Sequence, residues 1–486
     1  MHKSARRALV ALSISILASL AVTAAAADKP AKPAPATKVP GLEQVKSTTL
    51  ANGMKVIVWT DRDIPNVALY NWVRVGSRNE VPGITGLAHF FEHMMFNGTS
   101  KRAPGEFDKA MEAQGGSNNA FTSENVTVYQ DWFPRSALDL VFDLESDRLA
   151  NLSFDPKVVE SERGVVYSER RLSVEDNNGG FLVEQVQATA FVAHPYQIPT
   201  IGWPADIQSW KQEDLQKFFK TNYAPNNCTL ILVGDLSAEE GFALAKKYLE
   251  PIPRQAPPPP VRTTEPEQLG EKRVLIERPA QTPLLFYAYK SPAANDPQGP
   301  AINLLMSILA DGNSARLHRL LVEEKKQAIE VGGSFQEGFD PGLTWIQLTL
   351  PEGADLAAAE KTLDAALDDV VANGVTDAEL TRAKNQYAAA FWQKIATING
   401  KAALLGEFDV FDGDYRKLFD SPATYEKVTR ADVQKAAALI FQKNHRTVGV
   451  LRSPAEPAAA MPAAAPAPAA APAAATPAKP ATEAKP

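Results

Sequence analysis

Two histidines and a glutamate, close together in the chain, are the residues whose types and spacing could do chemistry. They lie in residues 86–98, where His89 and His93 stand four residues apart with Glu92 between them. Residues four apart share one face of a helix, so a helix here presents both imidazoles to one metal ion. Glu92 faces a different angle, toward the space beside the ion. The spacing therefore predicts two metal ligands and a base on a short helix that ends at residues 97–98.

A catalytic zinc site commonly adds one carboxylate to two imidazoles and leaves one position for water. The best source of that carboxylate is residues 155–169, which begin as a helix with Asp155 at the N-cap and Pro156 after it. Glu162 and Glu169 are seven residues apart and fall within the apolar stripe of this helix. A buried carboxylate needs a compensating cation, which a metal supplies. One glutamate can ligate while the other supports the site.

The stripe that brings these glutamates to the buried face consists of five apolar residues: Val158, Val159, Val165, Val166 and Leu172. Glu160 and Arg170 fall outside it. Either glutamate alone would more often be a salt-bridge partner, and a histidine pair on an apolar helix is more often core. The chain has only six histidines, however, and two of them flank a glutamate. The other four (His2, His194, His318 and His445) have no matching partners, and we interpret them as non-ligands.

The composition is that of a globular protein, with 45% hydrophobic and 22% charged residues in a chain of 486. A net charge of -7 argues against a nucleic-acid-binding protein, which is usually basic. Cys228 is the only cysteine, so no intramolecular disulfide can form. It lies in an apolar run that predicts a buried strand.

Charge and composition divide the chain into segments. Residues 1–27 are typical of a secretory signal, a retained membrane anchor being the alternative, and they predict export, most simply to the periplasm. Residues 28–42 form a flexible leader and 454–486 an Ala/Pro-rich disordered tail. No later segment is apolar enough to span a membrane. A Pro-rich linker, residues 251–268, separates residues 43–250 from 269–453.

The two large segments carry signs of a duplication. Asp214 and Asp432 open similar helices, Thr229 and Thr447 open similar β-runs, and both pairs are 218 residues apart. A helix at 301–309 occupies the place of the histidine helix in the second copy, but it has no metal-binding residues. The chemistry therefore resides in the first copy.

Residues 86–99, residues 118–122 (Asn-Asn-Ala-Phe-Thr), Glu162 and Glu169 together resemble the pitrilysin-type (M16) zinc peptidases. This family includes the mitochondrial processing peptidase and insulin-degrading enzyme. The resemblance covers residues ~43–453 and is specific in the first half and loose in the second. It implies that His89, His93 and Glu169 bind one Zn²⁺ per chain, that Glu92 is the general base, and that Glu162 supports the site.

The resemblance also implies an α+β fold of two homologous domains, each a mostly antiparallel sheet packed with helices, enclosing a chamber. Peptides or unfolded segments would add to a sheet edge as an extended strand and be cut by a zinc-dependent endopeptidase. Asn119, Ala120 and Phe121 match the region that contacts the substrate.

One departure concerns the second half. Active two-domain members usually place an arginine and a tyrosine after a Gly-x-x-Ser-Arg-Leu-like stretch, which is present here at residues 312–317. Val322 and Ile329 stand where that pair is expected. We therefore expect a related M16-like subunit to complete the site in a heterodimer, with a homodimer or a monomer as alternatives. A non-catalytic binding or assembly subunit is the competing function, and a zinc-storage protein a weaker third.

Overall fold

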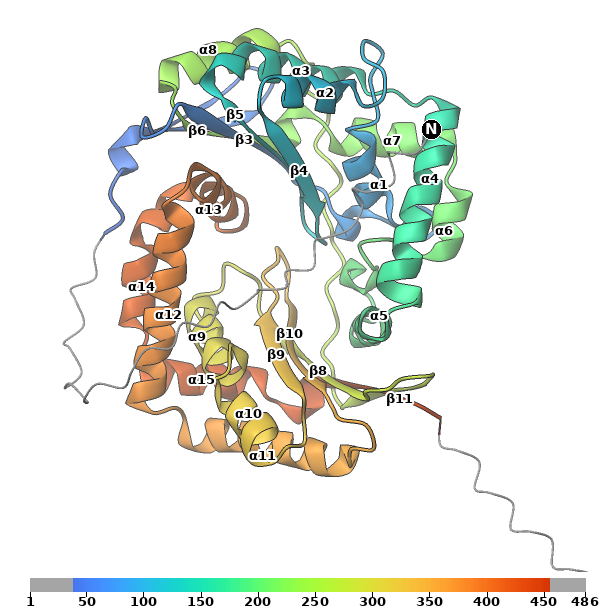
Figure 1. The fold of residues 1–486 in the computed structure, drawn as a ribbon, viewed down its shortest axis with the longest axis vertical. Helices are drawn as coiled ribbons and strands as arrows, with labels where there is room; N and C mark the ends of the chain where they lie inside the picture. Colours follow the sequence, from blue (N-terminus) through green and yellow to red (C-terminus); the bar gives the residue numbers. More distant parts are fainter. Residues whose placement is uncertain (1–37, 455–486) are drawn as a thin grey trace, which may run out of the picture. The chain divides into compact units, whose positions relative to one another are not determined.

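The computed structural model describes residues 38–454, so the predicted signal, most of the leader and nearly all of the tail lie outside the described residues. Within the described part, no helix is long and apolar enough to cross a membrane. Two separate sheets, one from each half of the chain, organise this part (Figure 1).

The first sheet has six strands in the order β1-β2-β6-β3-β5-β4. β2 and β6 run parallel, and every other neighbouring pair is antiparallel. The bounds of its strands are β1 (Val45–Thr49), β2 (Lys55–Thr60), β3 (Asn66–Val73), β4 (Ser117–Thr122), β5 (Thr127–Pro134) and β6 (Cys228–Gly234). Cys228 is buried in β6, as predicted. β4 forms an open edge of the sheet.

Eight α-helices accompany these strands in the described chain, and most are amphipathic. They are α1 (Leu87–Met94), α2 (Glu106–Ala113), α3 (Leu138–Asn151), α4 (Pro156–Arg170), α5 (Asn178–Ala190), α6 (Pro204–Ser209), α7 (Gln212–Asn222) and α8 (Ala238–Tyr248). The prediction that the histidine helix extends to residues 97–98 is wrong, since α1 ends at Met94. Tight turns replace helical bonds there: Phe96 N–H donates to His93 O, and Asn97 N–H to Met94 O.

The second sheet has five strands in the order β7-β11-β8-β10-β9, with β7 and β11 parallel and the other pairs antiparallel. Its strands are β7 (Lys272–Glu277), β8 (Leu284–Ser291), β9 (Glu330–Phe335), β10 (Gly342–Thr349) and β11 (Arg446–Arg452). The order and directions repeat β2-β6-β3-β5-β4 of the first sheet. Two homologous α+β units, each a mostly antiparallel sheet packed with helices, are therefore confirmed.

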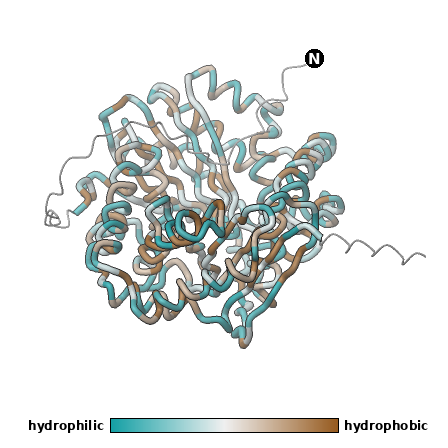
Figure 2. The backbone as a smooth tube through the Cα atoms, turned by 60° about the horizontal axis from the view of Figure 1, so that its bottom comes forward, coloured by the Kyte–Doolittle hydropathy of each residue, from teal (hydrophilic) through white to brown (hydrophobic). Residues whose placement is uncertain are grey.

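The helices of the second half likewise pack one apolar side inward. They are α9 (Gly299–Ala310), α10 (Arg316–His318), α11 (Leu356–Asn373), α12 (Asp377–Ile395), α13 (Ile398–Phe411), α14 (Ser421–Lys427) and α15 (Arg430–Ile440). Hydrophobic and hydrophilic residues alternate along the helical parts of the backbone (Figure 2), as expected for helices with one buried face. A second apolar core forms around α9, β8 and β10.

Each sheet is covered on one face by a helix from the other half of the sequence. α5 packs against β11, β8 and β7, while α13 packs against β6 and β3 (Figure 1). The contacts are close: a Cβ on Gly406 of α13 would lie 2.1 Å from the Trp72 ring, and one on Gly449 would lie 2.2 Å from Val186 of α5. Two of the four apolar cores thus contain residues from both halves.

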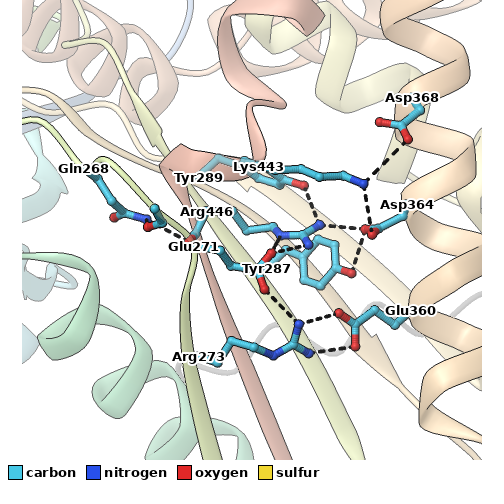
Figure 3. Close-up of polar contacts among 11 residues, drawn as sticks. Gln268, Glu271, Arg273, Tyr287, Tyr289, Glu360, Asp364, Asp368, Lys443 and Arg446 are labelled. Carbon is cyan, nitrogen blue, oxygen red and sulfur yellow. Dashed lines mark hydrogen bonds and ion pairs between the residues drawn. The ribbon is translucent and has the colours of Figure 1, made fainter.

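A network of charged residues binds β7, β11 and α11 together in the second half (Figure 3). Its centre is Arg446, which is almost fully buried and donates to Glu271 Oε2 at 2.8 Å and to Asp364 Oδ1 at 2.6 Å. The guanidinium also lies over the Tyr287 ring, 4.3 Å from its centroid. Both carboxylates compensate the buried charge, so removing either one would leave Arg446 partly uncompensated and destabilise the fold.

Candidate metal centre

The helix that carries the two histidines is anchored by its apolar side. Its buried apolar residues are Leu87, Ala88, Phe90, Phe91 and Met94. Gly86 starts the helix with a positive φ of 87°, and a Cβ there would lie 2.6 Å from the Ile201 carbonyl oxygen. Only glycine combines that backbone angle with so close an approach. These contacts fix the side of α1 on which His89, Glu92 and His93 stand.

The start of α1 is also held by a carboxylate that the sequence analysis missed. Glu80 is fully buried, and its two oxygens accept the backbone N–H groups of Gly86 at 2.6 Å and Ala88 at 2.7 Å. Burial raises the pKa of Glu80 well above its usual value, although these hydrogen bonds oppose the shift. Glu80 acts as a side-chain cap for the helix from six residues before the N-cap residue Gly86, where no standard N-cap spacing would reveal it.

α4 carries the two predicted glutamates to the histidines. The helix begins as expected, with the Asp155 side chain accepting from Lys157 N–H and proline at its first position. Glu162 Oε1 lies 2.7 Å from His93 Nδ1, so it can fix the orientation and tautomer of that ring. Glu169 approaches the other side of both rings.

Three side-chain atoms converge at one point. Glu169 Oε1 lies 3.7 Å from His89 Nε2, and Glu169 Oε2 lies 3.4 Å from His93 Nε2. The ligand atoms of all three residues lie within 4.8 Å of one another. Two atoms that are each about 2.0–2.1 Å from a tetrahedral zinc ion would be roughly 3.4 Å apart. The donor types and their spacing fit zinc, and within residues 38–454 no other such group occurs.

The electrostatics of the site favour a positive charge between these residues. Burial, together with the neighbouring His93, lowers the pKa of His89 to about 4, so its imidazole is neutral and able to ligate. Burial alone would lower the pKa of His93, but Glu162 and Glu169 outweigh it and raise that pKa to about 10. The two carboxylates thus favour a positive charge at His93, one from the Nδ1 side and one from the Nε2 side.

Glu92 projects beside this point and has a partner of its own. Thr122, the last residue of β4, donates its hydroxyl to Glu92 Oε2 at 2.5 Å. Burial raises the pKa of Glu92, although the hydrogen bond from Thr122 opposes the shift. The sequence placed Thr122 in a segment of interest but gave no sign of this contact, because nothing in the spacing of residues 92 and 122 indicates a pair.

Part of the predicted apolar stripe on α4 is wrong. Val159 and Val166 are buried, but Val165 is 40% exposed and Leu172 is 64% exposed. Arg170, expected outside the stripe, is instead buried and donates to Glu184 Oε2 at 2.7 Å. This ion pair compensates the buried charge, so an arginine takes the position that apolar periodicity assigns to an aliphatic residue.

The two site glutamates, Glu162 and Glu169, differ in how far their side chains are exposed. The side chain of Glu162 is 14% exposed and that of Glu169 is 45% exposed. Glu162 is therefore enclosed between α4 and α1, whereas Glu169 borders open space beside the histidines.

The predicted substrate-binding residues Asn119, Ala120 and Phe121 lie on β4, at the open edge of the first sheet. Phe121 is 40% exposed, and its ring meets Trp72 edge-on at 6.2 Å. The edge is available for pairing with an extended peptide, and their role in binding stays a prediction.

The second half adds no group to the metal centre. Arg316, in the stretch at residues 312–317, pairs with Glu379 at 2.7 Å. Val322 is half-buried, and Ile329 is 53% exposed just before β9. That these two stand in place of a substrate clamp stays a prediction. His194 lies 3.2 Å from Asp340, outside the converging group.

Comparison with known proteins identifies relatives along most of the chain. It is 29% identical over 416 residues to "Zinc protease PqqE" of Helicobacter pylori, covering 85% of this chain and 93% of that protein. It is 27% identical over 366 residues to a probable mitochondrial-processing peptidase subunit beta of Arabidopsis thaliana, covering 71% and 66%. The crystal structure of a protease from Helicobacter pylori matches with a TM-score of 0.81 and 28% identity, over 84% of this chain and 99% of that one.

Two family profiles match consecutive parts of the chain. "Insulinase (Peptidase family M16)" matches residues 55–203, which contain α1, α4 and β4. "Peptidase M16 inactive domain" matches residues 209–387. The profiles together span more than half of the chain, which belongs to peptidase family M16, the pitrilysin-like family.

Proposed function

We propose that this protein is a zinc-dependent endopeptidase that cuts peptides or unfolded polypeptide segments. The observation that carries the proposal is the convergence of His89, His93 and Glu169 at 3.4–3.7 Å, with Glu92 held beside them by Thr122. A binding or assembly subunit would have no use for a base positioned next to a metal site. The name "zinc protease" of the Helicobacter relative is consistent with this function.

In this proposal, the three ligands would hold one zinc ion, which supplies Lewis acidity toward a peptide carbonyl and acidifies water. Glu92 accepts the proton of the attacking water and passes it to the leaving amine. Thr122 orients the Glu92 carboxylate for both transfers. Glu162 keeps the His93 ring in the orientation that points Nε2 at the ion.

The substrate would lie along β4 as an added strand. An open sheet edge offers backbone N–H and C=O groups that bind any extended peptide regardless of its sequence. Because Thr122 ends β4, a peptide on this edge passes next to Glu92. This geometry suits an extended segment rather than a folded protein.

A partner subunit and export belong to the same proposal. The predicted absence of the arginine–tyrosine pair at Val322 and Ile329 favours a related subunit, and one relative is itself named as a subunit. Residues 1–27 favour export to the periplasm. A non-catalytic role is the second candidate, supported by the family description "inactive domain" for residues 209–387.

The test is cleavage of an internally quenched peptide library by the purified full-length chain, with and without a chelator. Mass spectrometry of copurifying proteins identifies any partner. We expect cleavage that a chelator abolishes and added zinc restores, by the chain alone or with its partner. Chelator-insensitive cleavage, or none in either form, would favour the non-catalytic role.

A further inference from the structure

A cavity of about 700 Å³ lies in the second half, away from the residues of the metal centre. It is bordered by α9, α12, α13, α14 and the loop after β9. Its size is that of pockets which bind small molecules or single side chains with their flanking backbone. Its aromatic wall is formed by Tyr387, Phe391, Phe408, Phe411 and Tyr425. Tyr387 and Tyr425 stack with their rings 9° from parallel.

Acidic side chains share this cavity with the aromatic rings. Glu407 is paired with Lys394 at 2.7 Å, and Asp412 has Lys417 at 3.8 Å. Glu337 differs from both, because among the described residues it forms no ion pair. Its one hydrogen-bond partner there is the amide of Asn303, at 2.8 Å.

Glu337 lines the cavity and is an exposed residue, so its carboxylate faces the open space that a ligand would occupy. Partial desolvation raises the pKa of this carboxyl, and Glu407 and Asp412 raise it further, while Asn303 and Lys394 oppose the shift. A cationic group placed in the cavity would be attracted by this carboxylate, because the lining holds six acidic and only two basic side chains. The aromatic wall suits the same kind of ligand, since rings attract cations over their faces and pack against aliphatic stems.

The cavity adjoins the hairpin that carries the proposed peptide-binding edge. Phe339 N–H donates to the side chain of Asn125 at 3.1 Å, and Asn125 lies in the turn between β4 and β5. Glu337 is two residues from Phe339, which places their Cα atoms within about 7 Å of each other. The turn that follows β4 therefore contacts the segment that borders the cavity, and we infer that a peptide continuing past Thr122 reaches it.

We propose that this cavity binds a lysine or arginine side chain of a peptide held along β4, with Glu337 as the anion that pairs with it. The identity of the ligand as a peptide rests on the proposed function. The cavity then selects substrates at a position remote from the cleaved bond. It prefers a cationic residue there over a neutral residue of the same shape.

The experiment uses the full-length protein and quenched peptides that carry one arginine, moved along the sequence, each with a citrulline twin. Hydrolysis of each pair is measured with zinc present, and binding is measured by fluorescence anisotropy with a chelator present. At one position we expect the arginine peptide to bind about tenfold more tightly and to have a correspondingly lower KM. Glu337→Gln should remove the difference and leave the citrulline peptide unchanged. The control Glu352→Gln makes the same charge change at an exposed residue outside the cavity and should preserve it.

The possible results of this experiment distinguish failure of the cavity proposal from failure of the proposed peptidase function. Hydrolysis without any arginine preference, or a preference that survives Glu337→Gln, would overturn the inference and leave the peptidase intact. A Glu337-dependent preference in binding without hydrolysis would support the cavity and count against the peptidase. Spermidine is tested as a free cation: if it binds in a Glu337-dependent manner while no peptide pair differs, the assignment to a peptide is wrong. Glu337→Ala serves as a second variant if Glu337→Gln misfolds.

Discussion

The two halves share one strand order, but their equivalent helices differ in which side chains they carry and how far these are buried. α1 and α9 each follow the strand at the centre of their sheet, β3 or β8. α9 is apolar nearly all round and is buried in the second core. α1 buries one side, and along the other it carries three polar residues, His89, Glu92 and His93.

The difference between the halves extends to the strands beside these helices. β4 ends in Thr122, which holds Glu92, whereas β9 has glycine at 332 and 333, and a Cβ on Gly333 would lie 2.8 Å from the Met306 side chain of α9. The second half therefore packs α9 directly against β9, whereas the first half places polar side chains between α1 and β4. A core position becomes a reactive one when a few side chains change and the backbone plan stays the same.

The largest effect that this comparison predicts is for Glu92→Gln. The amide keeps the shape of the side chain but cannot accept the water proton, so peptide cleavage should fall at least ~10³-fold. Zinc content, measured by mass spectrometry of the metal, should not change. Glu330→Gln on β9, the counterpart of β4, is the matched control and should retain full activity. Cleavage that persists in Glu92→Gln would remove this residue from its role.

Next in size is the loss of metal in Glu169→Ala. Removing one of three ligands should leave the purified protein with little zinc after dialysis. Glu162→Gln removes only the partner of His93 Nδ1, so zinc affinity should fall by about 10–100-fold. Competition with a fluorescent zinc indicator measures both affinities. Equal affinities in the two variants would show that the division between ligand and support is wrong.

A smaller effect is expected for Thr122→Val. Valine has nearly the same shape but cannot donate to Glu92, so the general base loses its orientation and kcat should fall about tenfold. KM and zinc content should remain as in the wild type. Thr122→Ser, which keeps the hydroxyl, should restore most of the rate. If serine and valine variants behave alike, the hydrogen bond has no part in catalysis.

The smallest effect concerns Arg316 and Glu379, the pair that makes the stretch at residues 312–317 structural. Burial alone would raise the pKa of Glu379, but Arg316 and Thr376 outweigh it and lower the pKa to about 2. A lowered folded-state pKa stabilises the protein above the unfolded value of roughly 4.3, and this stabilisation is lost as the pH falls toward 2.

Glu379→Gln should therefore lower the free energy of unfolding at pH 7 by about 1–2 kcal/mol, allowing for solvent screening of this partly exposed pair. Thermal unfolding at a series of pH values checks this. The difference in Tm between wild type and variant should shrink between pH 4.3 and pH 2. Glu323→Gln, at an exposed position in the same half, should show no such pH dependence. A constant difference across pH would mean that the ion pair is not its source.

Much of the fold could be predicted because its signals are local. The proline and aspartate that begin α4 are close together in the chain. The same holds for the His89–His93 spacing. The duplication also remained visible as a constant separation of 218 residues between equivalent positions, which predicts that the second half repeats elements of the first.

What could not be predicted depends on contacts between distant residues. The buried pair of Arg170 and Glu184 resembles two surface charges in the sequence, because each charge tolerates burial only when the other compensates it. Glu80 and Thr122 act on α1 from outside any capping or helical spacing. The exchange of α5 and α13 between the sheets leaves no periodic signal, since each helix shows one apolar face whichever sheet receives it.

Because α5 and α13 each cover the sheet of the other half, the connection between the halves at residues 251–268 can be considered separately from their packing. A cut within residues 251–268 would produce two fragments, each with one face of its own sheet bare and each carrying the helix that covers the other. We expect neither fragment to fold alone and the pair to reassemble, which mixing the two separately expressed fragments would test. In that test, residues 251–268 would contribute by keeping the two pieces at high local concentration.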